Sequence, residues 1–582
     1  MRTPYLFVVL PLLPLFCSEP APIKAAETHP FTIQDLVMLD RASELSASPN
    51  GRFLAFTLRS TDLEANKGKK DIWIVAASGG TPKRMTAHPA PDWGAQWLSD
   101  STLAFLSTRD GSTQIYTIEV DGGEAVKLSD LPVDAENLRV SPDGRLIGFS
   151  AEVYPDCPDL ACTAKRDKDA SSKKATGKVY DSLFVRRWDT WSNGKRNHVF
   201  VMPAKGGNPV DLMKGIDADG PTRPWGGIEE YAFSPDGKTV ALTFKAPMGS
   251  KEAWSTNEDI WLVPADGSAP PKNVSEDNPA RDSQPVFSPD GKSVAWLAMK
   301  KPGYEADKNR VVIYDIAAGQ KRWLTEEWDR TADTVLFAKD GDKLYVTGYE
   351  LGQHAIFTVD ARSGKVQLLL KDGHNDGVVE IDRGIAFLRD TITSPSEVFT
   401  FQGGRDKKLT ELNAERMSAV KLGTPEQFSF AGAKGETVYA YIVRPTDFDP
   451  AKKYPLAFLV HGGPQGSFGN DWHYRWNPQT YAGAGYGAVM IDFHGSTGYG
   501  QGFQDAINGD WGGAPYEDLM KGLDATLARY SWVDGGKVCA LGASYGAYMV
   551  NYIAGKTDRF KCLVSHDGNL DERMAYFDTE EL

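Results

Sequence analysis

A short turn motif recurs through the first two thirds of the sequence and constrains the fold more than any other feature. The clear copies read Ser-Pro-Asn-Gly or Ser-Pro-Asp-Gly and start at Ser48, Ser141, Ser234 and Ser288. Three degenerate copies lie at 98–100, 338–341 and 381–384. Each copy precedes an apolar strand, and a second apolar strand occurs in each repeat. Such a turn favours a tight reversal between antiparallel strands. Seven copies about 50 residues apart predict a seven-bladed β-propeller over residues 46–408.

The remaining residues follow a different pattern. A polar linker at 409–420 is followed by alternating apolar segments of strand and helix length, at 488–492, 516–529, 538–541, 547–554 and 561–565. Alternation of this kind is typical of an α/β domain with a largely parallel sheet. We therefore expect a fold of class β + α/β, with a propeller followed by an α/β-hydrolase domain over residues 421–582. Residues 27–45 form a short N-terminal segment.

The strongest chemical signal lies in Gly542-Ala-Ser-Tyr-Gly546, between an apolar strand and a helical segment. In that setting G-x-S-x-G forms a nucleophile elbow, a sharp turn that lifts the serine hydroxyl clear of the sheet. Ser544 would be the nucleophile, and the backbone N–H of Tyr545 would face the oxyanion. Alone, the motif also fits an ordinary Gly-rich turn beside a serine.

A second motif favours the catalytic interpretation. His461-Gly-Gly-Pro464 follows the apolar strand 454–460. A strand that ends in this way supplies the other half of an oxyanion hole in α/β-hydrolases, here from the N–H of Gly463. His461 lies directly before the oxyanion glycines and lacks an evident orienting group, so we expect it to brace the loop rather than act as the base.

The order of four motifs carries a family resemblance. His461-Gly-Gly-Pro464, Asp492 to Gly500, Trp511-Gly512 and the Ser544 elbow follow one another along the chain. This order resembles the dipeptidyl-peptidase and acylaminoacyl-peptidase members of the prolyl oligopeptidase family. The resemblance implies a serine exopeptidase that needs no metal or cofactor. Its substrates would be short peptides, because the propeller excludes folded proteins. Ala547 and His494 depart from the family's usual Gly and Arg.

The resemblance also implies where a substrate is held. An apolar pocket for the residue at the cleaved bond would follow the strand 561–565, and its candidate members are Leu570, Met574 and Tyr576, which could equally be ordinary core. Propeller carboxylates would hold the substrate's amino end. Glu229 and Glu230 precede a propeller turn, and Asp189 in the inserted loop is the competing candidate. An exposed strand edge with two solvated carboxylates is the competing interpretation.

An insertion between Ser150 and His198 interrupts the repeat. Its lysine-rich run at 165–178 is typical of a solvated, mobile loop. Its aromatic segment at 180–191 interleaves Trp and Tyr with charges that include Arg187 and Asp189. This segment is either a packed loop or a wall of the substrate chamber with charges for peptide termini.

Residues 1–26 resemble a secretory leader, with Arg2 ahead of an apolar stretch and small residues at the end. We therefore expect a periplasmic or secreted protein, in an oxidising compartment where cysteines pair. Cys157 and Cys162 share one polar loop, which predicts a local disulfide. Cys539 and Cys562 lie in apolar strands and are interpreted as buried thiols rather than metal ligands.

Charge and hydropathy exclude other partners. The net charge of −14 argues against nucleic acid. No apolar run after the leader approaches the length of a membrane span. The sequence leaves the oligomeric state open.

The residues after Ser544 lack the expected remainder of a catalytic triad. The hydrolase order is Ser, Asp or Glu, then His, and the only histidine after Ser544 is His566, with Asp558 before it. The fold brings the acid and the base from two further strand units, so we interpret His566 as structural. The expectation is a truncated product or an incomplete gene model that reacts poorly with a serine probe.

Three activities fit these observations. The first is a dipeptidyl-peptidase-like serine exopeptidase, and the second is an acylaminoacyl-peptidase or an esterase built on the same elbow. The third is a non-catalytic periplasmic propeller that binds peptides or proteins and retains a decayed hydrolase domain.

Overall fold

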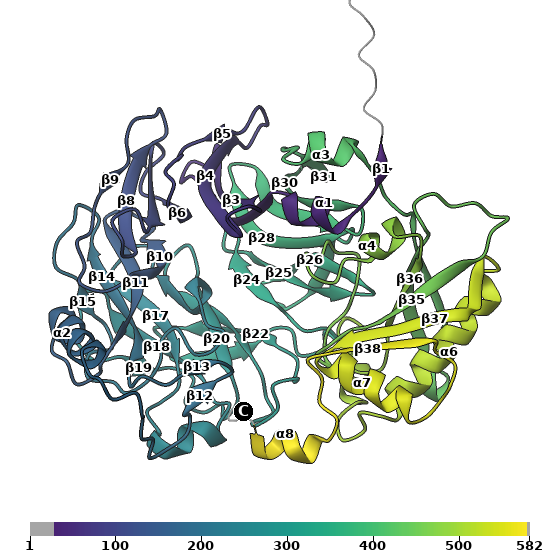
Figure 1. Cartoon of the computed structure of the whole chain (residues 1–582). Coiled ribbons are helices and arrows are strands. Elements are labelled where there is room, and N and C mark those ends of the chain that lie inside the picture. Colours follow the sequence, from purple (N-terminus) through teal and green to yellow (C-terminus); the bar gives the residue numbers. More distant parts are fainter. Residues whose placement is uncertain (1–27, 579–582) are drawn as a thin grey trace, which may run out of the picture.

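Two domains lie side by side in the computed structural model, which describes residues 28–578 (Figure 1). The predicted leader, residues 1–26, lies outside the described residues. Strands coloured purple to green form the propeller, and the green to yellow strands and helices form the hydrolase domain. Within residues 28–578, no helix has the length and apolar character needed to cross a bilayer.

The propeller consists of seven four-stranded antiparallel units, the last two joined through one bridge between β26 and β28. The first three are β2 (Arg41–Ala47), β3 (Phe53–Asp62), β4 (Lys67–Ala76), β5 (Lys83–Arg84); β6 (Asp92–Trp97), β7 (Thr102–Ser107), β8 (Gln114–Glu119), β9 (Val126–Lys127); and β10 (Glu136–Val140), β11 (Leu146–Val153), β14 (Arg196–Pro203), β15 (Val210–Asp211). The next two are β16 (Tyr231–Phe233), β17 (Thr239–Phe244), β18 (Asp259–Pro264), β19 (Lys272–Asn273); and β20 (Asp282–Phe287), β21 (Ser293–Ala298), β22 (Arg310–Asp315), β23 (Gln320–Trp323). The last two are β24 (Thr334–Phe337), β25 (Lys343–Glu350), β26 (Gln353–Asp360), β27 (Val366–Leu370); and β28 (His374–Ile381), β29 (Gly384–Thr391), β30 (Ser394–Gln402), β31 (Arg405–Lys408).

The repeated turn explains how successive blades fit together. The Ser141 hydroxyl donates to Asp143 (2.6 Å) and accepts from the Leu146 N–H (2.9 Å), which closes the turn. Gly144 has a φ of +70°, and a Cβ there would lie 2.4 Å from the Leu98 carbonyl oxygen of the preceding blade. The motif therefore needs glycine because the turn packs against its neighbour.

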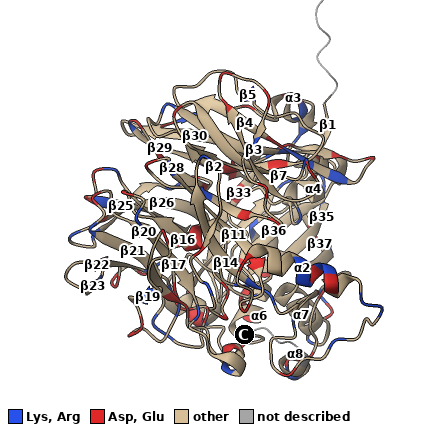
Figure 2. Cartoon of the chain, turned by 90° about the vertical axis from the view of Figure 1, so that its left-hand side faces the viewer, with Lys and Arg blue, Asp and Glu red and all other residues tan. Residues whose placement is uncertain are grey.

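The first part of the lysine-rich run is helical instead of the predicted loop, whereas residues 172–178 form no helix or strand. The insertion contains α2 (Leu160–Ser171), β12 (Arg186–Arg187) and β13 (Thr190–Trp191). Asp159 caps α2, the Cys157–Cys162 disulfide closes its first turn, and Lys165 pairs with Asp169 one turn on. Figure 2 shows basic and acidic segments side by side on α2. A cap, a crosslink and an i,i+4 ion pair together favour helix in a lysine-rich segment.

The chain enters and leaves the propeller through a short paired segment. Its elements are β1 (His29–Pro30), α1 (Ile33–Met38), α3 (Ala414–Ser418) and β32 (Val420–Lys421). β1 and β32 pair in parallel, so the start of the described chain packs on the linker between the domains. Two short 3₁₀ helices, Ile228–Glu230 and Gly249–Trp254, lie in the propeller.

The hydrolase domain is built on a six-stranded sheet of order β33-β34-β36-β35-β37-β38. Its strands are β33 (Pro425–Ala431), β34 (Thr437–Val443), β35 (Tyr454–Val460), β36 (Gly487–Asp492), β37 (Val533–Ala543) and β38 (Cys562–His566). Its helices are a 3₁₀ turn (Ala433–Gly435), α4 (Pro478–Gly483), α5 (Gln501–Asp505), α6 (Ala514–Arg529), α7 (Tyr545–Ala554) and α8 (Glu572–Asp578). The four strands from β36 to β38 run parallel.

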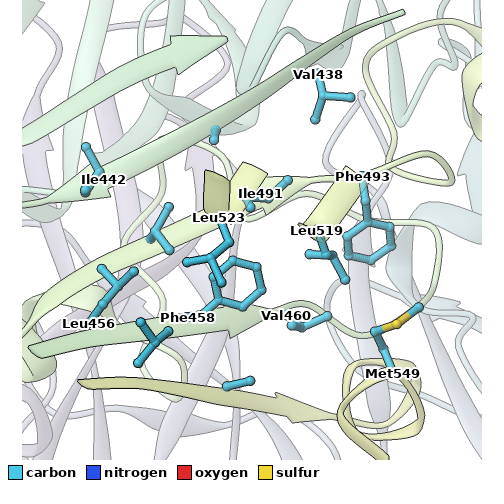
Figure 3. Packing of buried hydrophobic residues seen from close by; sticks show 14 of the residues in the cluster. Val438, Ile442, Leu456, Phe458, Val460, Ile491, Phe493, Leu519, Leu523 and Met549 are labelled. Atoms are coloured by element: carbon cyan, nitrogen blue, oxygen red, sulfur yellow. The ribbon is translucent and has the colours of Figure 1, made fainter. Parts of the chain in front are cut away.

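The apolar core of this domain holds the ends of the strands in place. Figure 3 shows Phe458 and Val460 from β35 packing beside Ile491 of β36, Leu519 of α6 and Met549 of α7. All five side chains are buried. Because α7 packs directly on β35, β37 and β38, the turn that joins β37 to α7 has a fixed position.

The structure corrects the prediction for Cys539 and Cys562. They are direct register partners on β37 and β38, with Cα atoms 4.6 Å apart, and they form a disulfide. β38 lies at the edge of the described sheet, and the Cys562 residue is exposed rather than buried. The apolar pattern of these strands indicated an interior position and gave no information about which strand lies at the edge.

Candidate active site

The turn between β37 and α7 places Ser544 in a strained backbone conformation. Its φ of +53° and ψ of −123° lie in a region that residues with a side chain rarely adopt. Despite the buried strand and helix around it, Ser544 is exposed. Strain of this kind persists where the surrounding structure enforces it, and it is common at catalytic nucleophiles.

The two glycines of the elbow are required by close backbone contacts. A Cβ on Gly542 would lie 2.4 Å from the Gly546 carbonyl carbon, and a Cβ on Gly546 would lie 2.3 Å from the Val460 carbonyl oxygen. The second contact joins the elbow to the end of β35, where the His461 loop begins. The elbow and that loop are therefore positioned by the same backbone packing.

Tyr545 starts α7 and is buried. Its hydroxyl donates a hydrogen bond of 2.7 Å to the Trp511 carbonyl, and burial raises the pKa of the phenol well above its usual value. The first N–H groups of a helix have no partner within the helix. The Tyr545 N–H is one of them, and it lies next to the Ser544 side chain.

His461 braces its loop. Its Nδ1–H donates to the Gly462 carbonyl (2.8 Å), so in the neutral ring Nε2 accepts from the Ser496 hydroxyl (2.8 Å). The ring stacks on Phe493 at 4.2 Å, and burial lowers the pKa of His461. A neutral imidazole with both nitrogens used in this way has no nitrogen left to serve Ser544.

Asp492, at the end of β36, fixes the other part of the same loop. Its carboxylate accepts hydrogen bonds from the Ser467 hydroxyl (2.6 Å), the Phe468 N–H (3.1 Å) and the Tyr499 hydroxyl (2.6 Å). The sequence pattern included Asp492 in a motif without assigning it a task. Its position after a buried strand was the signal that it could organise this edge of the sheet.

His494 takes the place in which the family usually has arginine. The ring is buried, and Nδ1 lies 2.6 Å from an Asp518 carboxylate oxygen on α6. Burial lowers the pKa of His494, but the hydrogen bond and charge of Asp518 outweigh burial, so the net shift is upward. The Asp518 carboxylate therefore orients the His494 ring toward α6 and favours its protonated form.

A cavity of about 350 Å³ opens beside the nucleophile. Ser544, Gly462 and Gly463 all line it. A Cβ on Gly462 would lie 3.4 Å from the Ser544 Cβ, so this loop passes very close to the nucleophile. The backbone can thus present N–H groups from two segments, the Gly463 loop and the start of α7, toward one point.

The triad that the order of residues allows does not form. The Ser544 N–H donates to the His566 carbonyl (3.1 Å), while the His566 ring makes an edge contact with Trp476 at 5.4 Å. Asp558 follows α7, a helix about 15 Å long that runs away from Ser544. Within residues 28–578, the Ser544 hydroxyl forms no hydrogen bond with a histidine or a carboxylate.

A larger chamber of about 1130 Å³ lies on the propeller side. Its wall includes Arg187 and Trp188 of the insertion. Most charges of this wall pair with each other. The pairs are Arg187–Glu252, Arg196–Glu252, Arg196–Asp219, Arg196–Asp217, Arg223–Asp219, Arg223–Glu152, Lys195–Glu152 and Lys195–Asp167.

One carboxylate of this chamber stands apart. The side-chain carboxylate of Glu136, at the start of β10, has no hydrogen bond or ion pair within the described part of the chain. The residue is exposed to the chamber, and partial desolvation together with the neighbouring carboxylates Glu152 and Asp134 raises its pKa, against the nearby charge of Arg223. Sequence reasoning missed Glu136, because nothing in its strand distinguishes it from a solvated edge residue.

The other candidates for the amino end lie elsewhere. Glu230 is buried, and it accepts from the Thr222 N–H (2.6 Å) and hydroxyl (2.9 Å). Burial and the nearby Glu258 raise the pKa of Glu230 to about 7. Glu229 is exposed and accepts from the Gly227 N–H, and Asp189 is exposed at the tip of the insertion. The residues that line the chamber include none of these three.

The three apolar pocket candidates also lie outside both cavities. Leu570, Met574 and Tyr576 are 78%, 61% and 70% exposed. They belong to α8 and the segment before it, which Figure 1 shows at the lower edge of the molecule. Their exposure excludes the ordinary-core interpretation in this structure.

Comparison with known proteins identifies the family. A model described as the prolyl oligopeptidase family matches residues 472–582, and one described as the TolB beta propeller domain matches residues 42–158. The dipeptidyl-peptidase 5 of Aspergillus fumigatus is 31% identical over 597 residues, which cover 95% of this chain and 80% of that protein. The chain belongs to the prolyl oligopeptidase family. The dipeptidyl-peptidase 5 of Porphyromonas gingivalis, a further relative, is 29% identical over 554 residues, or 94% of this chain and 79% of that protein.

Solved structures share the fold. An acylaminoacyl peptidase in complex with Z-Gly-Gly-Phe-chloromethyl ketone has a TM-score of 0.77 at 19% identity, covering 94% of this chain and 81% of that one. The acylaminoacyl peptidase of Pyrococcus horikoshii gives 0.76 at 19% identity, with 95% and 81% covered. As a member of the prolyl oligopeptidase family, the chain is a serine-type peptidase with a propeller and an α/β-hydrolase domain. Residues 28–578 contain no cluster of three or more His, Cys, Asp or Glu side chains that could hold a metal.

Proposed function

We propose that this protein releases dipeptides from the free amino end of short peptides, with Ser544 as the nucleophile. The observation that carries the proposal is the exposed Ser544 at a strained elbow, in one cavity with the Gly462–Gly463 loop. Relatives that are 29–32% identical over nearly the whole chain are named dipeptidyl-peptidase 5. That name supports dipeptide release over the acylaminoacyl-peptidase and esterase alternatives.

The chemistry follows from the elbow. The Ser544 Oγ forms a bond to the substrate carbonyl carbon, and the C–N bond then breaks to leave an acyl-enzyme. The hydroxyl proton ends on the nitrogen of the leaving amine, and water later releases the acyl part as a dipeptide. The N–H groups of Tyr545 and Gly463 would stabilise the oxyanion in between, a contribution on the order of 3 kcal/mol per donor in related sites.

We further propose that Glu136 binds the substrate's α-ammonium group. An unpaired carboxylate of raised pKa in a chamber is the group that gains most from an incoming cation, because a charge-assisted hydrogen bond is stronger than a neutral one. Glu230 is a weaker candidate, since Thr222 already uses its oxygens. Glu229, Asp189 and Arg187 would then act on the rim or on other parts of the peptide.

The test is product analysis by mass spectrometry on a tetrapeptide offered with a free and with an acetylated amino end. The proposal expects an intact dipeptide from the free form and little cleavage of the acetylated form. Glu136→Gln should reduce this preference, and Glu230→Gln serves as a buried control. Cleavage of the acetylated peptide alone, with release of an acylated amino acid, would make the protein an acylaminoacyl-peptidase.

We propose an exported location, periplasmic or secreted. The leader-like residues 1–26 and two disulfides support it, because disulfides persist in oxidising compartments. Cell fractionation followed by N-terminal sequencing tests this. Recovery from the cytoplasm with an intact N-terminus would overturn it.

A further inference from the structure

The cavity beside Ser544 has a cationic wall without a carboxylate. Arg475 lines it, together with Trp476 and the ring of His566, and no Asp or Glu is among the lining residues within 28–578. In a chain of net charge −14, a nucleophile site free of carboxylates is unexpected from composition. Such a cavity attracts an anionic group of the substrate.

Arg475 is available to that group. The residue is exposed, and within residues 28–578 its guanidinium forms no ion pair and no side-chain hydrogen bond. It lies near the Trp476 ring, with the guanidinium carbon 5.3 Å from the ring centroid. Its donors are therefore free, unlike those of Arg187, Arg196 and Arg223 in the propeller chamber.

The turn that carries Arg475 is held on both sides. His473 Nδ1 accepts hydrogen bonds from the backbone N–H groups of Arg475 and Trp476, each at 2.9 Å. Burial and the charge of Arg475 lower the pKa of His473, which keeps the ring neutral and able to accept. On one side, the Trp472 backbone N–H donates to Asp390 of the propeller (2.7 Å), and on the other Asn477 caps α4. The turn is thus preorganised, although the arginine tip is solvated.

We propose that Arg475 and this cavity form a subsite for the C-terminal carboxylate of the leaving fragment. The inference rests on the proposed function, in which the amino end of the peptide lies toward the propeller chamber. The other end then extends past Ser544 into the cavity, where a planar guanidinium matches a carboxylate. The protein would accordingly favour tripeptides and other very short peptides with a free carboxyl end.

Calorimetry in a Ser544→Ala background tests the subsite without turnover. The probes are Gly-Ala-Ala and its C-terminal amide, which differ only in the carboxylate. We expect the acid to bind about tenfold more tightly than the amide, the size of one charge-assisted hydrogen bond. Arg475→Gln should remove this preference, and Arg475→Lys should keep part of it, because an ammonium cannot form the paired geometry. Arg383→Gln is the matched control, since Arg383 is exposed on the propeller.

N-acetylated versions of both probes separate this inference from the proposed function. If acetylation weakens binding but acid and amide bind equally, the amino end is recognised and the carboxylate subsite is wrong. If acid is preferred, Arg475→Gln abolishes the preference and acetylation has no effect, the subsite stands and the dipeptidyl proposal fails. A preference for the acid that survives Arg475→Gln overturns the assignment of Arg475.

Discussion

At the scale of single residues, Ser544 is positioned by glycines on both sides of it. Gly542 and Gly546 are the positions at which a side chain would overlap backbone atoms, at 2.4 Å and 2.3 Å. The hydroxyl is exposed only because the chain turns within so small a space. Substitutions at these glycines should therefore change the position and reactivity of the Ser544 hydroxyl, although Ser544 itself is unchanged.

Gly546→Ala tests this reasoning. The added methyl would meet the Val460 carbonyl oxygen, so the elbow must shift, and overpacking of this kind costs about 1–3 kcal/mol of unfolding free energy. We expect lower stability in urea together with slower reaction of Ser544 with a serine probe. Gly555→Ala, at the other end of α7, is the control, because its nearest neighbour would lie at 3.7 Å. Equal effects of the two substitutions would contradict the account.

The residues of the site could be predicted from the sequence where a short motif fixes the local backbone geometry. G-x-S-x-G and the histidine before two glycines indicated the elbow and its companion loop, and the structure brings them into one cavity. Arg475 and Glu136 were not predictable, because an unpaired charge is defined by the absence of a partner in space. The Cys539–Cys562 pairing was missed for a similar reason, since register between two strands is not visible in either strand alone.

A thiol titration tests both disulfides at once. In protein without its leader, the four remaining cysteines form the pairs Cys157–Cys162 and Cys539–Cys562. We expect no free thiol in denatured, unreduced protein and four after reduction. Two free thiols before reduction would restore the interpretation of Cys539 and Cys562 as thiols.

At the scale of elements, the carboxyl ends of β35, β36 and β37 meet around the nucleophile. β36 contributes Asp492, which accepts three hydrogen bonds from the loop that follows β35 and from Tyr499. The position of the oxyanion loop therefore depends on a carboxylate that touches no substrate. Parallel strands bring such groups together at one edge of the sheet, which the alternation of strands and helices predicted in general terms.

Asp492→Asn should loosen that loop. The asparagine amide keeps the shape of the carboxylate but loses the charge that strengthens the three hydrogen bonds. One of the two carboxylate oxygens is also replaced by an NH₂ group, which donates and cannot accept. We expect peptide cleavage, measured as kcat/KM, to fall on the order of tenfold to hundredfold, with a small change in stability. Asp534→Asn, at the far end of β37, provides the control, and an unchanged kcat/KM in Asp492→Asn would show that the loop does not depend on it.

At the scale of the whole molecule, the propeller and the hydrolase domain meet in a charged cluster. The Nδ1 atom of His374 in β28 lies 3.3 Å from an Asp390 carboxylate oxygen. Asp390 also accepts a hydrogen bond from the backbone N–H of Trp472 in the hydrolase domain. Burial lowers the pKa of His374, but the hydrogen bond and charge of Asp390 and the charge of Asp471 raise it to about 9 overall. The interface is thus stabilised by a proton.

This cluster predicts a pH dependence with a definite sign. Because the folded pKa of His374 lies above the unfolded value of about 6.5, its contribution is complete below about pH 6.5 and disappears as the pH rises through 9. The full contribution is at most about 3 kcal/mol. Thermal unfolding of wild type and His374→Gln should therefore differ most near pH 6 and converge near pH 10. A difference that grows with pH would contradict the assignment.

The overall architecture was the most predictable part of the fold. Repeated turns implied the propeller, because each Ser-Pro-Asp-Gly copy closes its own hairpin through local hydrogen bonds. The insertion was less predictable, since α2 depends on a disulfide and a cap that its lysine-rich composition conceals. Substrate residues were the least predictable, because chamber walls combine segments from distant parts of the chain.

The central claim is that Ser544 is the nucleophile of a preformed elbow, and covalent labelling tests it most directly. Folded protein is treated with a fluorophosphonate, and the modified residue is located by peptide mass spectrometry. We expect modification of Ser544 in folded protein, slow because no histidine hydrogen-bonds its hydroxyl within residues 28–578, with none at that position after unfolding in urea and none anywhere in Ser544→Ala. Labelling of another residue, or labelling that persists in Ser544→Ala, would contradict the claim.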